Sequence, residues 1–138
     1  MLDDIKGKKR ILLVDDDEIH LITAELFLKS EYEIIKMRSG EEALVYVNSK
    51  EPTPDLILLD IVMPVMDGWE VFKRMRLIES LKNVPIAFLT SIESEAEKKK
   101  AYKFGIADYI TKPFNMTVLN KEIKDVLKKY EASKNTHK

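Results

Sequence analysis

The stretch ILLVDDDE, residues 11–18, places four aliphatic residues directly before four acidic ones. The aliphatic half predicts a strand covered on both faces, because strands of a parallel sheet read as continuous apolar runs and not as an alternation. The acidic half gathers like charges at the end of that strand, which costs free energy unless a positive partner offsets the repulsion. The stretch therefore predicts a buried parallel strand with a charged site at its carboxyl end.

Further short apolar runs follow along the chain, and each is expected to be a strand: residues 32–37, 56–59, 86–89 and 109–110. Segments with the helical spacing of apolar residues lie between and after them. Strand and helix alternate five times over, and this order predicts an α/β three-layer sandwich with right-handed crossovers.

Apolar stripes indicate which side of a helical segment is buried. The clearest stripe lies in the last segment and comprises Leu119, Ile123, Val126, Leu127 and Tyr130. In the first segment, the expected apolar face comprises Ile19, Ile22, Leu26 and Phe27. Two segments open with a capping-box pattern, which predicts where their helices begin: Ser39-x-x-Glu42 and Ser94-x-x-Glu97.

Length and composition exclude several classes of protein. The 138 residues suit a single domain, 1–138, for which we expect a folded core at about residues 8–130 and a flexible tail at 131–138. A net charge of −1 argues against direct nucleic-acid binding. The absence of cysteine excludes disulfides, thiol catalysis and cysteine-ligated zinc. Without a signal peptide or an apolar run of membrane-spanning length, the chain is expected to be cytoplasmic and not membrane-bound.

The predicted strand ends carry polar side chains. Asp15 and Asp16 follow the first strand, Asp60 the third, Thr90 the fourth and Lys112 the fifth. Ligands of open α/β sheets bind beyond these carboxyl ends. Two carboxylates about 4 Å apart repel by roughly 4 kcal/mol at an effective dielectric constant near 20, and a divalent cation relieves this repulsion. All-oxygen ligands favour Mg²⁺, Mn²⁺ or Ca²⁺ over zinc, and Mg²⁺ commonly shares a phosphoryl oxygen. The rim therefore predicts a metal site that meets phosphate.

Four motifs stand in order at strand ends: VDD at 14–16, LLDIVMPVMDG at 58–68, FLTS at 88–91 and DYITKPF at 108–114. Together they resemble the receiver domain of two-component response regulators, over about residues 8–130. The resemblance implies a flavodoxin-like fold, with a five-stranded parallel sheet in the order 2-1-3-4-5 and five helices.

The resemblance also implies a phosphorylation site. Asp60 matches the phosphoacceptor, which takes its phosphoryl group from the phosphohistidine of a sensor histidine kinase or of a histidine phosphotransfer protein. Asp16 matches the acidic ligand of Mg²⁺, for which Mn²⁺ can substitute, and Asp15 matches its partner. Asp60 and the main-chain carbonyl of Val62 would complete the metal site. Such a protein modifies itself once per signal and is not a turnover enzyme.

Other matched residues surround the phosphoacceptor. By resemblance, Lys112 and Thr90 contact the phosphoryl group, and Thr90 and Tyr109 form the switch pair, with Tyr109 turning inward after phosphorylation. Pro113 is expected to follow a cis peptide bond, and both Pro113 and Gly68 are expected to be structural. The switch would act on a partner-binding surface formed by the fourth helix, the fifth strand and the fifth helix.

Three further residues are expected to touch the phosphodonor: His20, Thr23 and Phe114. Glu122 stands where DNA-binding members of the family usually have an arginine in their dimer interface. We therefore expect a monomer or a weak dimer that acts on a downstream protein. Two residues that influence water access in the family, Val62 and Ile92, are apolar here, which predicts slow self-dephosphorylation.

Two other functions compete with this interpretation. A haloacid-dehalogenase-type phosphatase would use Asp15-x-Asp17 with Asp15 as its nucleophile, but the chain is too short for a cap and lacks a second acidic pair late in the sequence. A flavodoxin-like electron carrier shares the topology, yet the acids after the first strand would repel the phosphate of FMN. The P-loop pattern is missing, which excludes a P-loop enzyme.

Overall fold

The computed structural model describes residues 7–136, and of these it describes residues 132–136 by backbone alone. Across this range, five strands and five α-helices alternate, with a 3₁₀ turn, η1 (Glu79–Leu81), before the fourth strand. The elements are β1 (Lys9–Val14), α2 (Glu18–Leu28), β2 (Tyr32–Met37), α3 (Gly40–Val47), β3 (Leu56–Leu59), α4 (Gly68–Met75), β4 (Ile86–Thr90), α5 (Glu95–Lys103), β5 (Asp108–Thr111) and α6 (Met116–Thr136). All strand pairs are parallel, in the order β2-β1-β3-β4-β5. The predicted fold class and strand order are confirmed.

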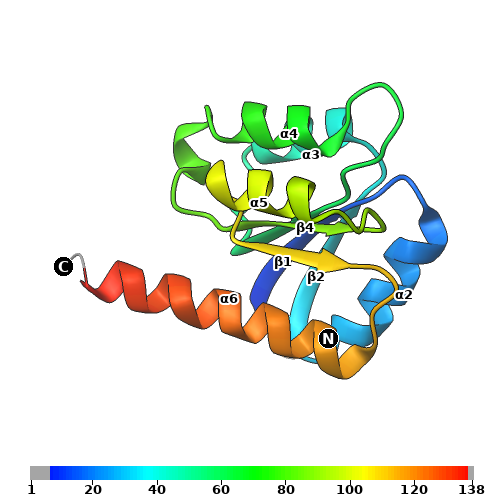
Figure 1. Cartoon of the computed structure of the whole chain (residues 1–138). Coiled ribbons are helices and arrows are strands. Elements are labelled where there is room, and N and C mark those ends of the chain that lie inside the picture. The colour runs from blue at the N-terminus through cyan, green and yellow to red at the C-terminus, as the bar shows by residue number, and fades with distance from the viewer. Residues whose placement is uncertain (1–6, 137–138) are drawn as a thin grey trace.

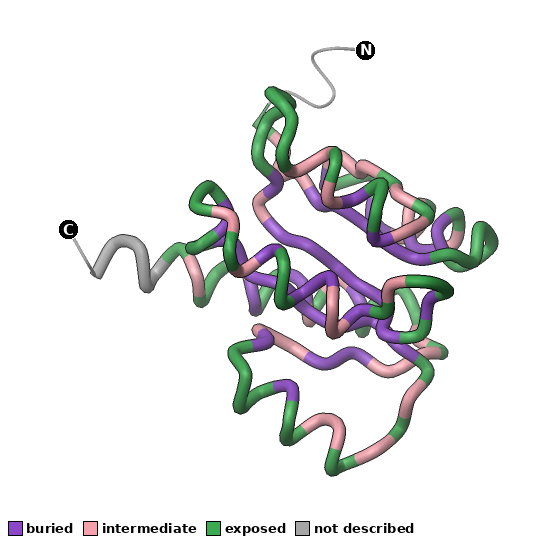
Figure 2. The backbone as a smooth tube through the Cα atoms, turned by 90° about the horizontal axis from the view of Figure 1, so that it is seen from above, coloured by how far each residue is buried: buried purple, intermediate pink, exposed green. Residues whose placement is uncertain are grey.

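The sheet separates two helical layers. Helices α3, α4 and α5 cover one face, and α2 and α6 cover the other (Figure 1). Along β1, Leu12 and Val14 join the apolar core under the first layer, while Ile11 and Leu13 join the core under the second. Burial on both faces explains why the strand reads as a continuous apolar run. Figure 2 shows this burial running along the strands, with exposed residues on the outer sides of the helices.

The predicted buried face of α2 is wrong except for Phe27, which packs against the core. Ile19, Ile22 and Leu26 are 73%, 44% and 57% exposed, and the side chains that pack on the sheet are Leu21, Ala24 and Leu28. Both sets have the same helical spacing, so periodicity alone does not choose between them. With Leu21, Ala24 and Leu28 on the sheet, Ile19, Ile22 and Leu26 form an apolar stripe in water.

Both predicted helix starts are confirmed. Ser39 Oγ accepts a hydrogen bond from the Glu42 amide at 3.1 Å, and Ser94 Oγ accepts one from the Glu97 amide at 3.2 Å. The Glu97 carboxylate does not return to the cap and instead accepts a hydrogen bond from Trp69 Nε1 at 2.5 Å. The hydrogen bond between Trp69 and Glu97 therefore ties α4 to α5.

The last helix extends beyond the predicted core. We expected the folded part to end near residue 130, whereas α6 continues as helix to Thr136. Lys9 forms an ion pair with Glu131 at 2.6 Å, which joins this helix to β1. Residues 137–138 of the expected flexible tail lie outside the described residues.

Candidate functional site

Three carboxylates converge where β1 and β3 end. Val14 and Leu59 are register partners, so the next residues along each strand emerge side by side. The Asp60 amide donates to Val14 O at 2.9 Å, which holds Asp60 against the end of β1. One carboxylate oxygen from each of Asp15, Asp16 and Asp60 lies within 4.8 Å of the others. The sheet register therefore builds the acidic rim that the sequence predicts.

Lys112 lies among these acids. Its Nζ is 2.5 Å from Asp15 Oδ2, 3.5 Å from Asp60 Oδ2 and 2.9 Å from His20 Nδ1. The backbone amide of Lys112 donates to Thr90 O at 2.7 Å, and the Lys112–Pro113 peptide bond is cis, as expected. One ammonium group thus faces two buried carboxylates and offsets only part of their charge.

The Asp60 carboxyl has a raised pKa. Burial is the largest cause, and the charge of Asp15 adds to it, while Lys112 and the Val62 amide, 3.4 Å from Asp60 Oδ1, act in the opposite direction. A raised pKa means that ionised Asp60 lacks sufficient positive charge around it. Since Asp16 is exposed and opens the cluster to solvent, a cation can reach the carboxylates and supply that charge. The all-oxygen donor set is compatible with Mg²⁺.

The proposed switch pair lies on the next two strands. Thr90 is fully buried, and its Oγ1 accepts a hydrogen bond from the Ile92 amide at 3.3 Å. Tyr109 is only 6% exposed and donates its hydroxyl to Ile92 O at 2.8 Å. Burial raises the pKa of this phenol. We expected the ring to turn inward after phosphorylation, whereas it is already inward in this structure.

Gly68 backs the strand end that carries Asp60. Its amide donates to Ile61 O at 2.7 Å, where α4 begins. A Cβ atom at this position would lie 2.7 Å from Ile61 Cα and closer still to the backbone oxygen of Asp60. The structural role predicted for Gly68 therefore has a steric basis, because no side chain fits behind Asp60.

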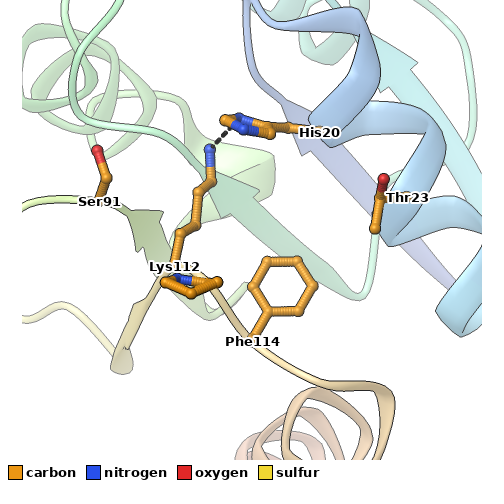
Figure 3. A pocket seen from close by; sticks show the side chains of 6 residues that line it. His20, Thr23, Ser91, Lys112 and Phe114 are labelled. Atoms are coloured by element: carbon orange, nitrogen blue, oxygen red, sulfur yellow. Dashed lines mark hydrogen bonds between the residues drawn. The ribbon is translucent and has the colours of Figure 1, made fainter.

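A pocket of about 310 Å³ lies beside the acids. The three residues expected to touch the phosphodonor line it together: His20, Thr23 and Phe114. Figure 3 shows the Lys112 side chain reaching toward His20, with Thr23 and Phe114 on the α2 side of the lysine. The contact between His20 and Lys112 joins residues 92 positions apart and had no signal in the sequence.

Two acidic residues, Asp108 and Glu122, lie on the surface formed by α5, β5 and α6. The hydroxyl of Tyr102 donates to Asp108 Oδ1 at 3.1 Å. A hydrogen bond with Asp108, together with burial and the charge of Asp108, raises the pKa of Glu122 to about 7. This surface therefore presents carboxyl groups and no positive charge at residue 122.

A parallel α/β sandwich with acids, a hydroxyl and a lysine at its strand ends defines a phosphate-handling module. The family model of the response regulator receiver domain matches residues 11–124, and the chain belongs to this family, which acts in two-component signalling.

Relatives of known identity agree with this assignment. The chain is 39% identical to the chemotaxis protein CheY of Halobacterium salinarum, over 86% of this chain and 97% of that protein. It is 37% identical to the alkaline phosphatase synthesis transcriptional regulatory protein PhoP of Bacillus subtilis, over 91% of this chain. The crystallised chemotaxis protein CheY4 of Vibrio cholerae superposes with a TM-score of 0.80 at 31% identity, covering 87% of this chain and 99% of that one.

The relatives differ in length. The chain spans 51% of the PhoP relative and 97% of the CheY relative. Receiver domains interact with histidine kinases or phosphotransfer proteins.

Proposed function

We propose that this receiver domain is switched by transfer of a phosphoryl group from a phosphohistidine to Asp60. The observation that carries the proposal is the placement of the Asp60 carboxylate at an open rim, with Asp15, Asp16 and the ammonium of Lys112 around it. Phosphoryl transfer depends chiefly on positioning and charge neutralisation, and this rim supplies both.

In the proposed reaction, a carboxylate oxygen of Asp60 attacks phosphorus. The new O–P bond forms as the P–N bond to the donor histidine breaks, and the imidazole, whose other ring nitrogen carries a proton in the phosphohistidine, leaves as a neutral ring. Lys112 leaves Asp15 and contacts the phosphoryl oxygens, where negative charge increases. Thr90 turns its hydroxyl from the Ile92 amide to the phosphoryl group. Asp60 and Lys112 already lie together at the rim, and Thr90 is the last residue of the neighbouring strand β4.

The proposed metal is Mg²⁺, with Mn²⁺ as a substitute. When bound, the ion supplies positive charge to the carboxylates and the phosphoryl oxygens. Asp15, Asp16 and Asp60 would hold it, because their oxygens converge within 4.8 Å. The main-chain carbonyl of Val62 remains a predicted fourth ligand. EDTA is expected to prevent labelling by acetyl phosphate, and labelling of equal extent in EDTA would contradict the metal requirement.

The proposed output is a change in the surface of α5, β5 and α6. Thr90 and Tyr109 connect to this surface through Ile92, which bonds to both of them. When the Thr90 side chain moves toward the phosphoryl group, the Ile92 amide that donates to its Oγ1 either follows or loses this bond, so the loop before α5 moves in both cases. Because Tyr109 is already inward, the loop and not the ring is expected to carry the switch in this chain. We propose that a downstream protein binds this surface.

The phosphatase alternative fits the structure less well. Asp17 Oδ1 accepts hydrogen bonds from the amides of Ile19 and His20, at 2.9 and 3.4 Å, and so caps α2. The residue that such a phosphatase would use as its nucleophile, Asp15, is paired with Lys112. We propose that the chain is not a turnover enzyme, and steady release of phosphate from an aryl phosphate would contradict this.

The exposed stripe on α2 is expected to dock the phosphodonor. Replacing Ile22 with glutamate should slow transfer from a phosphorylated histidine phosphotransfer protein by about tenfold, because a buried apolar anchor at an interface contributes of this order. Labelling by acetyl phosphate, which needs no docking, should not change. Val45→Glu is the matched control, since Val45 is 71% exposed on α3. An equal loss with both phosphodonors would contradict docking.

The phosphorylated state is expected to be long-lived. Val62 is 60% exposed beside Asp60, and its apolar side chain cannot orient a water molecule for attack. Replacing Val62 with asparagine should shorten the half-life of phospho-Asp60 several-fold, which loss of acid-labile phosphate over time would measure. A half-life of seconds in the unaltered protein would contradict the prediction.

Among residues 7–136, no helix is both long and apolar enough to cross a membrane. We propose a cytoplasmic location, where the kinase domains of two-component systems use ATP, and fractionation of cells would check it. We also propose a monomer or weak dimer, because Glu122, next to Asp108, supplies no positive charge at the face that would pair. Sedimentation velocity of the beryllofluoride-treated protein checks this.

A further inference from the structure

An apolar groove of about 540 Å³ lies between α4 and the C-terminal end of α5. Phe72 and Trp69 line it, and the Trp69 ring packs edge-on against Phe104, with centroids 6.2 Å apart. Leu77 and Phe104 flank it and are 84% and 60% exposed. Large apolar side chains exposed together in a concave surface are typical of a binding site.

The groove carries cations on its apolar lining. Lys100 Nζ lies 4.5 Å from the centroid of the Trp69 ring, and Arg76 Cζ lies 5.2 Å from the centroid of Phe72. Lys73 also lines the groove and pairs with Glu70 at 3.5 Å. No carboxylate lines the groove. Within residues 7–131, where side chains are described, neither Lys100 nor Arg76 has a carboxylate ion-pair partner.

The positions of these cations are held by the fold. Arg76 Nη1 donates to Leu81 O at 3.2 Å and to Val84 O at 3.1 Å, so its guanidinium is fixed beside the groove. Trp69 is held by its hydrogen bond to Glu97 and by edge-on packing on Phe88, with centroids 5.0 Å apart. A fixed aromatic surface with fixed positive charge is preorganised, which lowers the entropic cost of binding.

We propose that this groove docks an acidic amphipathic segment of a partner protein. Its apolar side chains would pack on Trp69 and Phe72, and its carboxylates would face Lys100 and Arg76. Charge complementarity selects this occupant, because a basic segment would meet positive charge. The exposed Leu77 and Phe104 favour protein side chains over a nucleic-acid backbone. The surface is separate from the phosphorylation rim and extends the proposed function to a second contact.

Trp69 is the only tryptophan of the chain, so its fluorescence reports on the groove. The probe is a short synthetic peptide with leucine and phenylalanine on one helical face and glutamate on the other, titrated into the unphosphorylated protein without metal. We expect a saturable change in emission, and the affinity should fall about tenfold in Lys100→Glu, where attraction becomes repulsion. Lys99→Glu, an exposed neighbour on α5, is the matched control and should bind unchanged.

A second peptide with lysine in place of glutamate should cause no saturable change. Equal binding of the two peptides, no saturable binding of the acidic one, or the same loss in Lys99→Glu would overturn the proposal. If a thymidine oligonucleotide binds more tightly than the acidic peptide, the groove binds nucleic acid and the proposal is overturned. If the peptide-free protein forms a dimer that Lys100→Glu dissociates, the groove binds a second copy of the chain, and the proposal is again overturned. Circular dichroism of both variants confirms that they fold. None of these results depends on phosphorylation of Asp60.

Discussion

Replacing Asp60 with asparagine is expected to abolish labelling by acetyl phosphate and Mg²⁺. The amide has no anionic oxygen to attack phosphorus, so the acyl phosphate cannot form. Labelling should fall below detection, whereas the unaltered protein should gain one phosphoryl group that maps to Asp60. Intact-mass spectrometry measures the extent of labelling, and fragmentation after borohydride reduction locates the phosphorylated aspartate.

Asp17→Asn provides the matched control. Asparagine also caps helices well, so α2 should keep its start and labelling should continue. The phosphatase interpretation predicts the opposite, because there Asp15 is the nucleophile and Asp17 its acidic partner. Labelled Asp15 in the Asp60→Asn protein would therefore reject the receiver mechanism.

Asp60→Asn should also stabilise the metal-free fold at neutral pH. The pKa of Asp60 is raised in the folded state, chiefly by burial. A carboxyl with a raised pKa favours folding below its unfolded pKa, and this contribution is lost as pH rises through the folded pKa. Asparagine does not ionise, so that loss should disappear. Urea unfolding from acidic to neutral pH would show a flatter pH dependence for Asp60→Asn, and an unchanged dependence would contradict the assignment.

Replacing Gly68 with alanine is expected to lower the free energy of unfolding by about 3 kcal/mol, because overpacking against backbone atoms cannot be relieved by a rotamer change. The added Cβ would lie 2.7 Å from Ile61 Cα and nearer to the Asp60 carbonyl oxygen. Either α4 or the end of β3 must move. Since the end of β3 carries the phosphoacceptor, the rate of labelling by acetyl phosphate should fall as well. Urea unfolding and a labelling time course measure the two effects.

Gly105→Ala separates this steric effect from backbone preference. Gly105 has φ +98°, and nothing lies within 4 Å of a Cβ added there. Its substitution should cost only the conformational preference of glycine, about 1 kcal/mol, and should leave labelling unchanged. If Gly68→Ala costs no more than Gly105→Ala, the strand end yields easily and our steric account of Gly68 is wrong.

Much of the fold could be predicted because its signals are local. Continuous apolar runs mark strands buried on both faces, and β1 has this pattern from Ile11 to Val14. The acidic rim was predictable for a related reason: parallel strands end at the same edge, so Asp15 and Asp60 must emerge together. Serine caps were also readable, because a capping side chain bonds to an amide only three residues away.

Other features depend on which surfaces meet in three dimensions. The buried face of α2 was mispredicted, because two stripes of equal spacing compete and only packing on the sheet selects Leu21, Ala24 and Leu28. The inward position of Tyr109 follows from its hydrogen bond to Ile92 O, 17 residues away. Neither preference is encoded in the spacing of apolar residues.

By itself, the sequence determined the succession of strands and helices along the chain and the chemistry at each strand end, because continuous apolar runs, a period of 3.6 residues and the direction of a parallel strand are local properties. Only the tertiary structure decided that His20 meets Lys112 and that Trp69, Arg76 and Lys100 share one groove. Such contacts join residues far apart in the chain, and their distances are set by how the layers pack.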